Sequence, residues 1–208
     1  MDVSRVETTR TWWWPAAMGA ILLLGLALRL HGIHDPILDH PGWRQGDTAA
    51  IARNFATLDF NPFHPQTDYD GPPPNYVELE LQIVPFLAAA LYKIFGIHEI
   101  FGRLISIAFG LGTIAVVGAY ARYAFGTRLA GAVAALAFAI YPGTVYYSRT
   151  FMPDTTMTFF LTAAVFAAAR WIDDTDGPRF GRRFWVAASL AAAALLAKPV
   201  AAVGLVPV

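Results

Sequence analysis

The chain of 208 residues contains no cysteine and is poor in charge. The absence of cysteine excludes disulfide frameworks, thiolate metal sites and cysteine nucleophiles. Only 14% of the residues are charged, against about 25% in ordinary soluble domains. The 15 basic residues balance the 15 acidic ones, so no bulk charge favours nucleic acid. With 56% hydrophobic residues and a mean hydropathy of +0.47, the chain is neither an ordinary soluble domain nor a disordered one. We expect a polytopic membrane protein.

Common site motifs are also missing. The sequence holds no GxxxxGK[ST], GxGxxG, HExxH, GxSxG or N-x-[ST] pattern. Its five histidines show no pair at metal-ligand spacing on a credible helix. We therefore expect no zinc site and no cofactor, while a requirement for a divalent metal stays open.

Apolar runs of about 20 residues are long enough to cross the hydrocarbon of a bilayer as helices. The first run carries three tryptophans at its start, as an interfacial belt does, and no cleavage site follows it, so we expect an uncleaved anchor. An all-α fold with about five transmembrane helices is expected, over residues 11–30, 104–121, 129–147, 155–171 and 184–204. The last apolar run continues to residue 208, which suggests the amino-terminal portion of a longer protein.

The segment 79–96 is ambiguous, and the distribution of arginine decides how we interpret it. If it does not cross, eight arginines share one side of the membrane: Arg5, Arg10, Arg122, Arg128, Arg170, Arg179, Arg182 and Arg183. Short basic loops stay cytoplasmic. We therefore expect 79–96 to lie on the surface, in an outer loop over 31–103 that carries interfacial helices. The short loop 148–154 then shares the outer face with it.

The first cluster of polar residues precedes a predicted amphipathic helix over 48–58. Asp47 stands at the expected start of this helix, beside Trp43 and Arg44. Asp47 is either a helix N-cap or a catalytic carboxylate, because both roles suit an acid at this place.

Two further clusters follow. Asp70 precedes a proline triplet, which fixes an extended backbone and favours either a stiff surface turn or a rigidly held acid. Asp154 follows a proline and is either a helix cap or a site residue. Arg149 suits a lipid phosphate or a snorkelling anchor. Lys198, inside an apolar run, lies near an interface or pairs with a buried anion.

The order of these parts resembles that of the type C glycosyltransferases, in particular the protein O-mannosyltransferase and aminoarabinose-transferase-like group. The resemblance covers roughly residues 15–200. It rests on the acidic loop with its interfacial helix, the proline-rich turn, the segment Tyr92–Glu99 with Arg103-Leu104, and the Tyr147-Ser148-Arg149…Pro153-Asp154 junction. The form WRQxDT is similar to the branch of lipopolysaccharide-core galacturonosyltransferases.

The resemblance implies a truncated membrane glycosyltransferase domain over 1–208. It implies transfer of a sugar from a polyprenyl-phosphate donor to a lipid, glycan or protein acceptor. The reaction would take place at the periplasmic face of the inner membrane. The expected partners include membrane lipids but no nucleic acid. By resemblance the first essential acid is Asp47, or Asp39 if the helix register differs, and Asp154 is the later one. The family's lysine is missing from the turn after Asp70.

The residue types are consistent with this chemistry. A carboxylate can take the proton of an acceptor hydroxyl as general base, and a leaving phosphate needs cations, here Arg44, Arg103 or Arg149. Direct attack with one base predicts inversion at the sugar. A transporter or flippase for lipid-linked sugars is the alternative from another class, and it would place polar residues deep in several spans. A non-catalytic membrane scaffold is a third, which would not need the acids.

Overall fold

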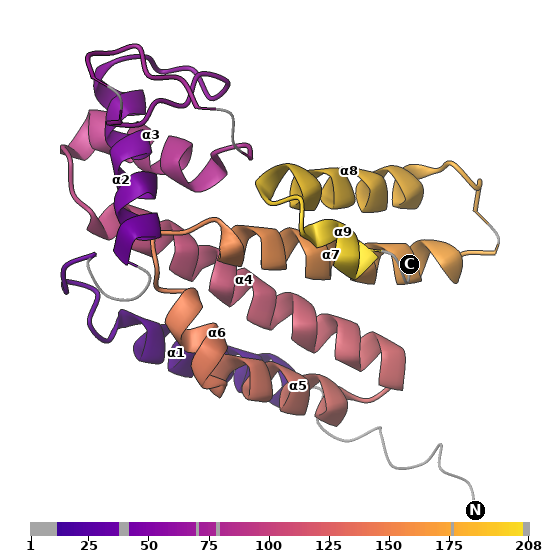
Figure 1. Ribbon diagram of the computed structural model, residues 1–208. Helices are drawn as coiled ribbons and strands as arrows, with labels where there is room; N and C mark the ends of the chain where they lie inside the picture. The colour runs from indigo at the N-terminus through magenta and orange to yellow at the C-terminus, as the bar shows by residue number, and fades with distance from the viewer. Residues whose placement is uncertain (1–11, 38–41, 70, 78–79, 176, 206–208) are drawn as a thin grey trace, which may run out of the picture.

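A computed structural model describes residues 12–37, 42–69, 71–77, 80–175 and 177–205. Within these ranges the chain forms nine helices and no named strand, which confirms the all-α prediction (Figure 1). In chain order they are α1 Trp13–Leu30, α2 Gly42–Thr57, α3 Ile83–Phe95, α4 Ile100–Phe125, α5 Arg128–Ile140, α6 Pro142–Tyr147, α7 Asp154–Ile172, α8 Arg182–Ala197 and α9 Ala201–Leu205.

The long helices run back and forth between two ends of a bundle (Figure 1). Helix α4 packs against α1, α5 and α7, and α8 packs on α7. Helices α2 and α3 pack together at one end, where α1, α5 and α8 finish and α4 and α7 begin. We name this the α2–α3 end. The opposite end, formed by the 122–128 and 170–183 connections and the start of α1, is named the arginine-rich end.

Three helices are long and apolar enough to cross a membrane: α1, α4 and α7. Two of the five expected spans are not single helices in the structure, and whether they cross the membrane stays a prediction. The predicted span 129–147 is divided into α5 and α6, and 184–204 into α8 and α9. A proline follows each break, and the residue before proline is driven out of the helical region. Tyr141 accordingly has ψ 123° and Lys198 has φ −165° and ψ 119°.

The break before Pro142 leaves backbone carbonyls of α5 to be satisfied by side chains. Pro142 has no N–H to donate to the carbonyl four residues earlier. Thr144 Oγ1 donates to the carbonyl of Phe138 at 2.5 Å, and Arg29 Nη1 donates to that of Ala139 at 3.0 Å. The end of α5 is thereby tied to α1.

Helix α3 has 13 residues and spans about 20 Å, less than the roughly 30 Å of hydrocarbon. The structure places it on α2 rather than along the bundle (Figure 1). The membrane topology of 79–96 stays a prediction. The described parts of 31–103 and the segment 148–154 do lie at the same end of the bundle, as the predicted topology requires.

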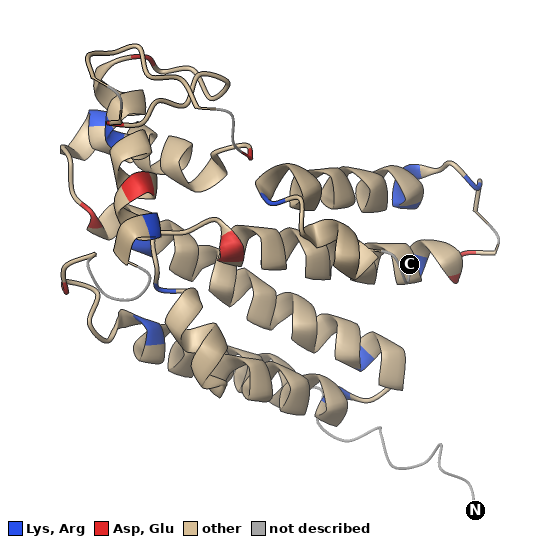
Figure 2. Ribbon diagram, in the orientation of Figure 1, with Lys and Arg blue, Asp and Glu red and all other residues tan. Residues whose placement is uncertain are grey.

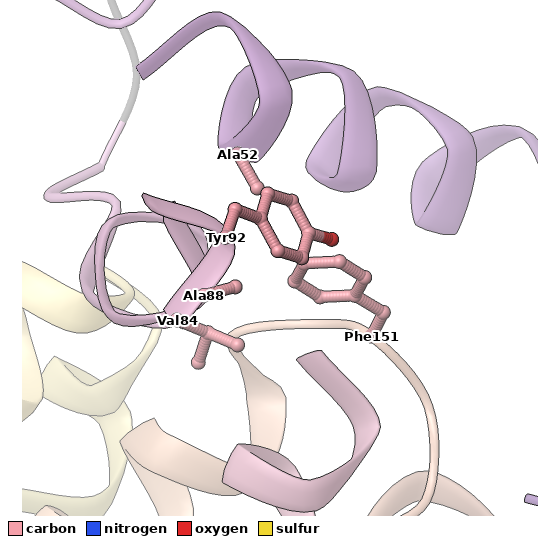
Figure 3. Close-up of a cluster of buried hydrophobic side chains, with 5 residues drawn as sticks. All are labelled: Ala52, Val84, Ala88, Tyr92 and Phe151. Carbon is pink, nitrogen blue, oxygen red and sulfur yellow. The ribbon is translucent and has the colours of Figure 1, made fainter. Parts of the chain in front are cut away.

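A buried apolar cluster joins the α2–α3 end to the start of α7. It consists of Ala52 from α2, of Val84, Ala88 and Tyr92 from α3, and of Phe151 from the segment before α7 (Figure 3). Phe151 is fully buried, and its ring lies so close to Gly102 that any side chain at position 102 would overlap it. The position of Phe151 is therefore fixed by packing against α2 and α3 on one side and α4 on the other.

Candidate functional site at the α2–α3 end

Asp47 lies within α2 and not at its start. The described helix begins at Gly42, so Asp47 is in its second turn, and the predicted helix start at 48 is wrong. The N-cap interpretation of Asp47 fails with it, because an N-cap residue precedes the first helical residue. The carboxylate instead accepts a hydrogen bond from the Tyr69 hydroxyl. That bond raises the pKa of Tyr69, since the neighbouring negative charge disfavours a phenolate.

The residues just before Asp47 have separate tasks. The Trp43 side chain is 73% exposed. Arg44 forms an ion pair with Glu80, which ties α2 to the approach to α3. Gln45 is buried, and its side-chain oxygen accepts a hydrogen bond from the backbone N–H of Phe151 at 3.1 Å. This bond anchors the first turns of α2 beside the segment that leads to Asp154.

The segment after α2 is held by side chains that the sequence analysis did not single out. Asn54 donates to the carbonyl of Gln66 at 3.0 Å and to the Asp68 carboxylate at 2.9 Å. Arg53 pairs with the same carboxylate at 2.6 Å. The Asn54 hydrogen bond and the Arg53 charge lower the pKa of Asp68. These contacts hold Tyr69 where it meets Asp47.

Two predicted site residues, Asp39 and Asp70, lie outside the described residues.

A helix does start at the Pro-Asp sequence, but Asp154 is the first residue of α7 and does not act as its cap. Its Oδ1 accepts a hydrogen bond from Lys198 Nζ at 2.6 Å, and its Oδ2 is buried without a hydrogen-bond partner among the described residues. Lys198 is brought there by the break between α8 and α9. Of its two predicted environments, the structure shows the pairing with an acid. Since a buried acceptor without a partner is costly, Asp154 is a candidate for contact with a ligand.

Asp154 also lines a cavity of about 390 Å³ between α4, α5, α6 and α7. Hydroxyl groups dominate its polar lining, and the sequence analysis did not foresee them because they come from separate helices. The hydroxyl-bearing residues are Thr113, Tyr141, Thr144, Tyr147, Ser148, Thr155 and Thr158. Five of them already donate to backbone carbonyls, namely Thr113, Thr144, Ser148, Thr155 and Thr158. Their oxygens can still accept hydrogen bonds, so the lining suits a small ligand that carries several hydroxyl donors. We name this space the hydroxyl cavity.

Arg149 and Arg103 meet the backbone that leaves α1. Arg149 donates to the carbonyl of His31 at 2.6 Å and lies over the Tyr146 ring at 5.4 Å. Arg103 is buried and donates to the carbonyls of Gly32, Ile33 and Pro36 at 2.9–3.1 Å. These bonds indicate that Arg103 holds the segment that follows α1 in place.

Arg29 is a buried cation that the sequence analysis did not predict as a site residue. It is fully buried near the end of α1, and its Nε donates to Ser148 Oγ at 2.7 Å. Ser148 lines the hydroxyl cavity. The only available signal was an arginine in the last turn of an apolar span, where snorkelling to the interface is the usual outcome.

Among the described residues, no group of three or more His, Asp or Glu side chains could hold a metal ion. The expectation of a reaction without a cofactor stays a prediction.

A family model for dolichyl-phosphate-mannose-protein mannosyltransferases matches residues 82–208, more than half of the chain. The chain belongs to this family. It is accordingly a membrane glycosyltransferase of the mannosyltransferase type, which confirms the broader part of the resemblance seen in the sequence. The match includes Arg103, Arg149, Asp154 and Lys198, whereas Asp47 precedes it. No curated protein and no solved structure gives a significant match.

Proposed function

We propose that the protein transfers a sugar from a polyprenyl-phosphate donor to a hydroxyl group of a lipid, glycan or protein acceptor. The reaction would take place at the α2–α3 end. The observation that carries this proposal is the Asp154–Lys198 pair on the wall of the hydroxyl cavity, beside the ends of membrane-length helices. A sugar can be bound by the hydroxyl groups, while the hydrocarbon chain of the donor stays in the bilayer. The WRQxDT form supports assignment to the galacturonosyltransferase-like branch.

The proposed reaction is a single displacement. The acceptor oxygen attacks the anomeric carbon and forms the new glycosidic bond, while the bond from that carbon to the phosphate oxygen breaks. The electron pair leaves with the polyprenyl phosphate, and the acceptor proton passes to a carboxylate of the enzyme. One displacement inverts the configuration at the anomeric carbon.

Asp47 is the proposed general base. Its carboxylate accepts a hydrogen bond from Tyr69 and is partly exposed. Asp39 is the second candidate, on the register of the family resemblance. The exposed indole of Trp43 offers an apolar face for a sugar ring or a lipid chain. Arg44 is the proposed cation beside it, and Asp70 is proposed as a substrate-binding residue on the family resemblance.

The proposed role of the cations is to stabilise the leaving phosphate. Lys198 lies next to the cavity and Arg149 at the exit of α1. Asp154 would orient the Lys198 ammonium toward the phosphate of the donor. Before the donor binds, the Asp154 carboxylate would compensate the positive charge of Lys198. The arginine distribution supports an orientation with this end away from the cytoplasm, and the inner membrane with its periplasmic face is proposed on the family resemblance.

The test compares Asp47→Asn with a matched control, Asp59→Asn, in the full-length protein reconstituted in vesicles. Asparagine preserves size and hydrogen bonding but cannot take a proton. We expect Asp47→Asn to fold and to lose roughly 10²–10⁴-fold in turnover of a labelled polyprenyl-phosphate sugar, the usual contribution of a general base. The control should keep its turnover, because Asp59 pairs with His64 on the surface of the same end.

Near-normal turnover in Asp47→Asn with collapse in Asp39→Asn would move the general base to Asp39. Full activity in both variants would leave the proposed mechanism without a base. Movement of the labelled donor across the vesicle membrane without cleavage of its sugar–phosphate bond would favour the flippase alternative.

A further inference from the structure

A second cavity opens at the arginine-rich end, far along the bundle from Asp154. Its volume is about 790 Å³, and it lies between α4, α7 and α8. Helix α7 packs against both neighbours and runs between them (Figure 1). The lining changes character along the cavity, since its mouth is charged and its wall is apolar.

Three arginines and one acid form the mouth: Arg170, Arg182, Arg183 and Asp174. Asp174 forms a salt bridge with Arg183, with 2.8 Å between Oδ2 and Nη1. Arg170 lies over the rings of Tyr123 and Phe166, each at 6.0 Å, and Arg182 is exposed. Neither Arg170 nor Arg182 forms a salt bridge with any residue that the structure describes. Two positive charges therefore remain at the mouth without an acidic partner in the described chain.

The wall of the cavity is suited to hydrocarbon. Val116 on α4, Phe166 and Ala167 on α7, and Val186 and Leu190 on α8 line it. These helices include two that are long and apolar enough to cross a membrane. An apolar groove that follows such helices from a cationic mouth matches one class of molecule in both halves, a lipid with an anionic headgroup.

We propose that this cavity binds an anionic phospholipid of the adjacent leaflet, with its phosphate between Arg170 and Arg182 and an acyl chain along the apolar wall. Guanidinium groups hold phosphate oxygens through paired, charge-assisted hydrogen bonds. Basic pockets between membrane helices recognise anionic headgroups in the same way. The site involves neither Asp47 nor Asp154, so it stands independently of the proposed sugar transfer.

The experiment measures lipid binding to the purified full-length protein in detergent by native mass spectrometry. Phosphatidylglycerol is the probe. Phosphatidylcholine, whose phosphate is balanced by a quaternary ammonium so that it has no net charge, is the comparison, and glycerol phosphate and inorganic phosphate are the sources without an acyl chain. We expect phosphatidylglycerol to bind more tightly than the other three. The double variant Arg170→Gln/Arg182→Gln should weaken its binding at least tenfold, since each basic residue near a headgroup contributes about fivefold.

Two control variants separate charge from shape. Arg128→Gln removes the same charge at the same end, outside the cavity, and should leave binding within about twofold. Ala167→Leu narrows the apolar wall and should weaken phosphatidylglycerol while the arginines stay in place. Equal affinity for phosphatidylglycerol and phosphatidylcholine, or a double variant that binds like the unaltered protein, would overturn the proposal. Glycerol phosphate binding as tightly as phosphatidylglycerol would reduce the cavity to a simple anion site.

Discussion

Charged residues gather toward both ends of the bundle (Figure 2), but the buried arginines Arg29 and Arg103 belong to one of them. At the α2–α3 end, Arg29 and Arg103 are buried and bonded to backbone carbonyls, and Lys198 pairs with Asp154. At the arginine-rich end, Arg170 and Arg182 are exposed. Burying a charge is costly unless it is paired and hydrogen-bonded. The α2–α3 end, where cations are buried, also carries the hydroxyl cavity. The arginine-rich end, where they are exposed, suits contact with water and lipid headgroups.

The largest predicted effect concerns which side of the membrane each end faces. Single cysteines replacing Phe60, Ile100 or Gly177 can be tested with a membrane-impermeant thiol reagent in intact cells, since the chain has no cysteine of its own. We expect full labelling at 60 and 100 and none at 177, because short arginine-rich loops stay cytoplasmic. Labelling at only one of positions 60 and 100 would place Asp47 and Asp154 on opposite sides of the membrane. The α2–α3 end could then not be a single site on one face.

The next prediction tests whether the buried arginines support the fold. Arg103→Met removes the donor for three carbonyls, and leaving such groups unsatisfied costs about 3 kcal/mol of unfolding free energy. The matched control, Arg122→Met at the other end, loses only an exposed stacking contact with Trp14, worth about 0.5 kcal/mol. Denaturant titration in mild detergent measures both. Similar losses in the two variants would mean that the ends do not differ in this respect.

A smaller effect is predicted at Arg149, where the two interpretations differ in the role of the charge. If Arg149 binds the donor phosphate, Arg149→Ala should weaken binding of polyprenyl-phosphate sugar about tenfold, and Arg149→Lys by less, because lysine keeps the charge but not the paired geometry. Donor binding to the purified protein measures this. Unchanged affinity in both variants would make Arg149 an interfacial anchor.

The smallest prediction concerns pH and the segment that presents Tyr69. The pKa of Asp68 lies below its ordinary value of 3.8, so the folded state favours the charged carboxylate. Its contribution to stability is therefore complete above pH 3.8 and is lost as the pH falls through the lower, folded pKa. Because the Asp68–Arg53 pair is half exposed, the loss is about 0.5 kcal/mol.

Hydrogen exchange at the backbone N–H groups of Thr67 and Val77, which bond to the carbonyls of Asn75 and Pro65, measures this opening. The protection factor, which corrects exchange for the intrinsic effect of pH, should be lower in Asp68→Asn than in the unaltered protein at neutral pH and should not fall further at low pH. A protection factor that does not change with pH in the unaltered protein would contradict the assignment.

Local patterns predicted much of the fold. The apolar runs located α1, α4 and α7, and the Pro-Asp pair indicated the start of α7 to within one residue of the predicted span 155–171. The sequence also contains the signal for dividing 129–147 and 184–204, since Pro142 and Pro199 follow the two breaks. The prediction gave more weight to the hydrophobicity of these segments than to the two prolines. The earlier start of α2 was missed because its first turns contain two glycines, which disfavour helix when taken alone.

The site was harder to predict from the sequence than the fold, because its residues come from segments that are far apart along the chain. The hydroxyl cavity draws side chains from four helices, and a threonine in an apolar helix gives no signal of where it points. Arg29 and Ser148 are 119 residues apart. Asn54, which holds Asp68, looks like an ordinary polar residue of an amphipathic helix. Contacts of this kind are set by tertiary packing and not by local pattern.

The rim of the hydroxyl cavity has a kinetic consequence. Tyr141 and Tyr147 line the cavity and are 63% and 45% exposed, so its rim is accessible from outside the bundle. Under the proposed function, a donor anchored by its hydrocarbon chain would arrive by two-dimensional diffusion within the leaflet. The enzyme would then respond to the mole fraction of donor among the lipids, and diluting the vesicles at constant lipid composition would leave the rate per enzyme unchanged.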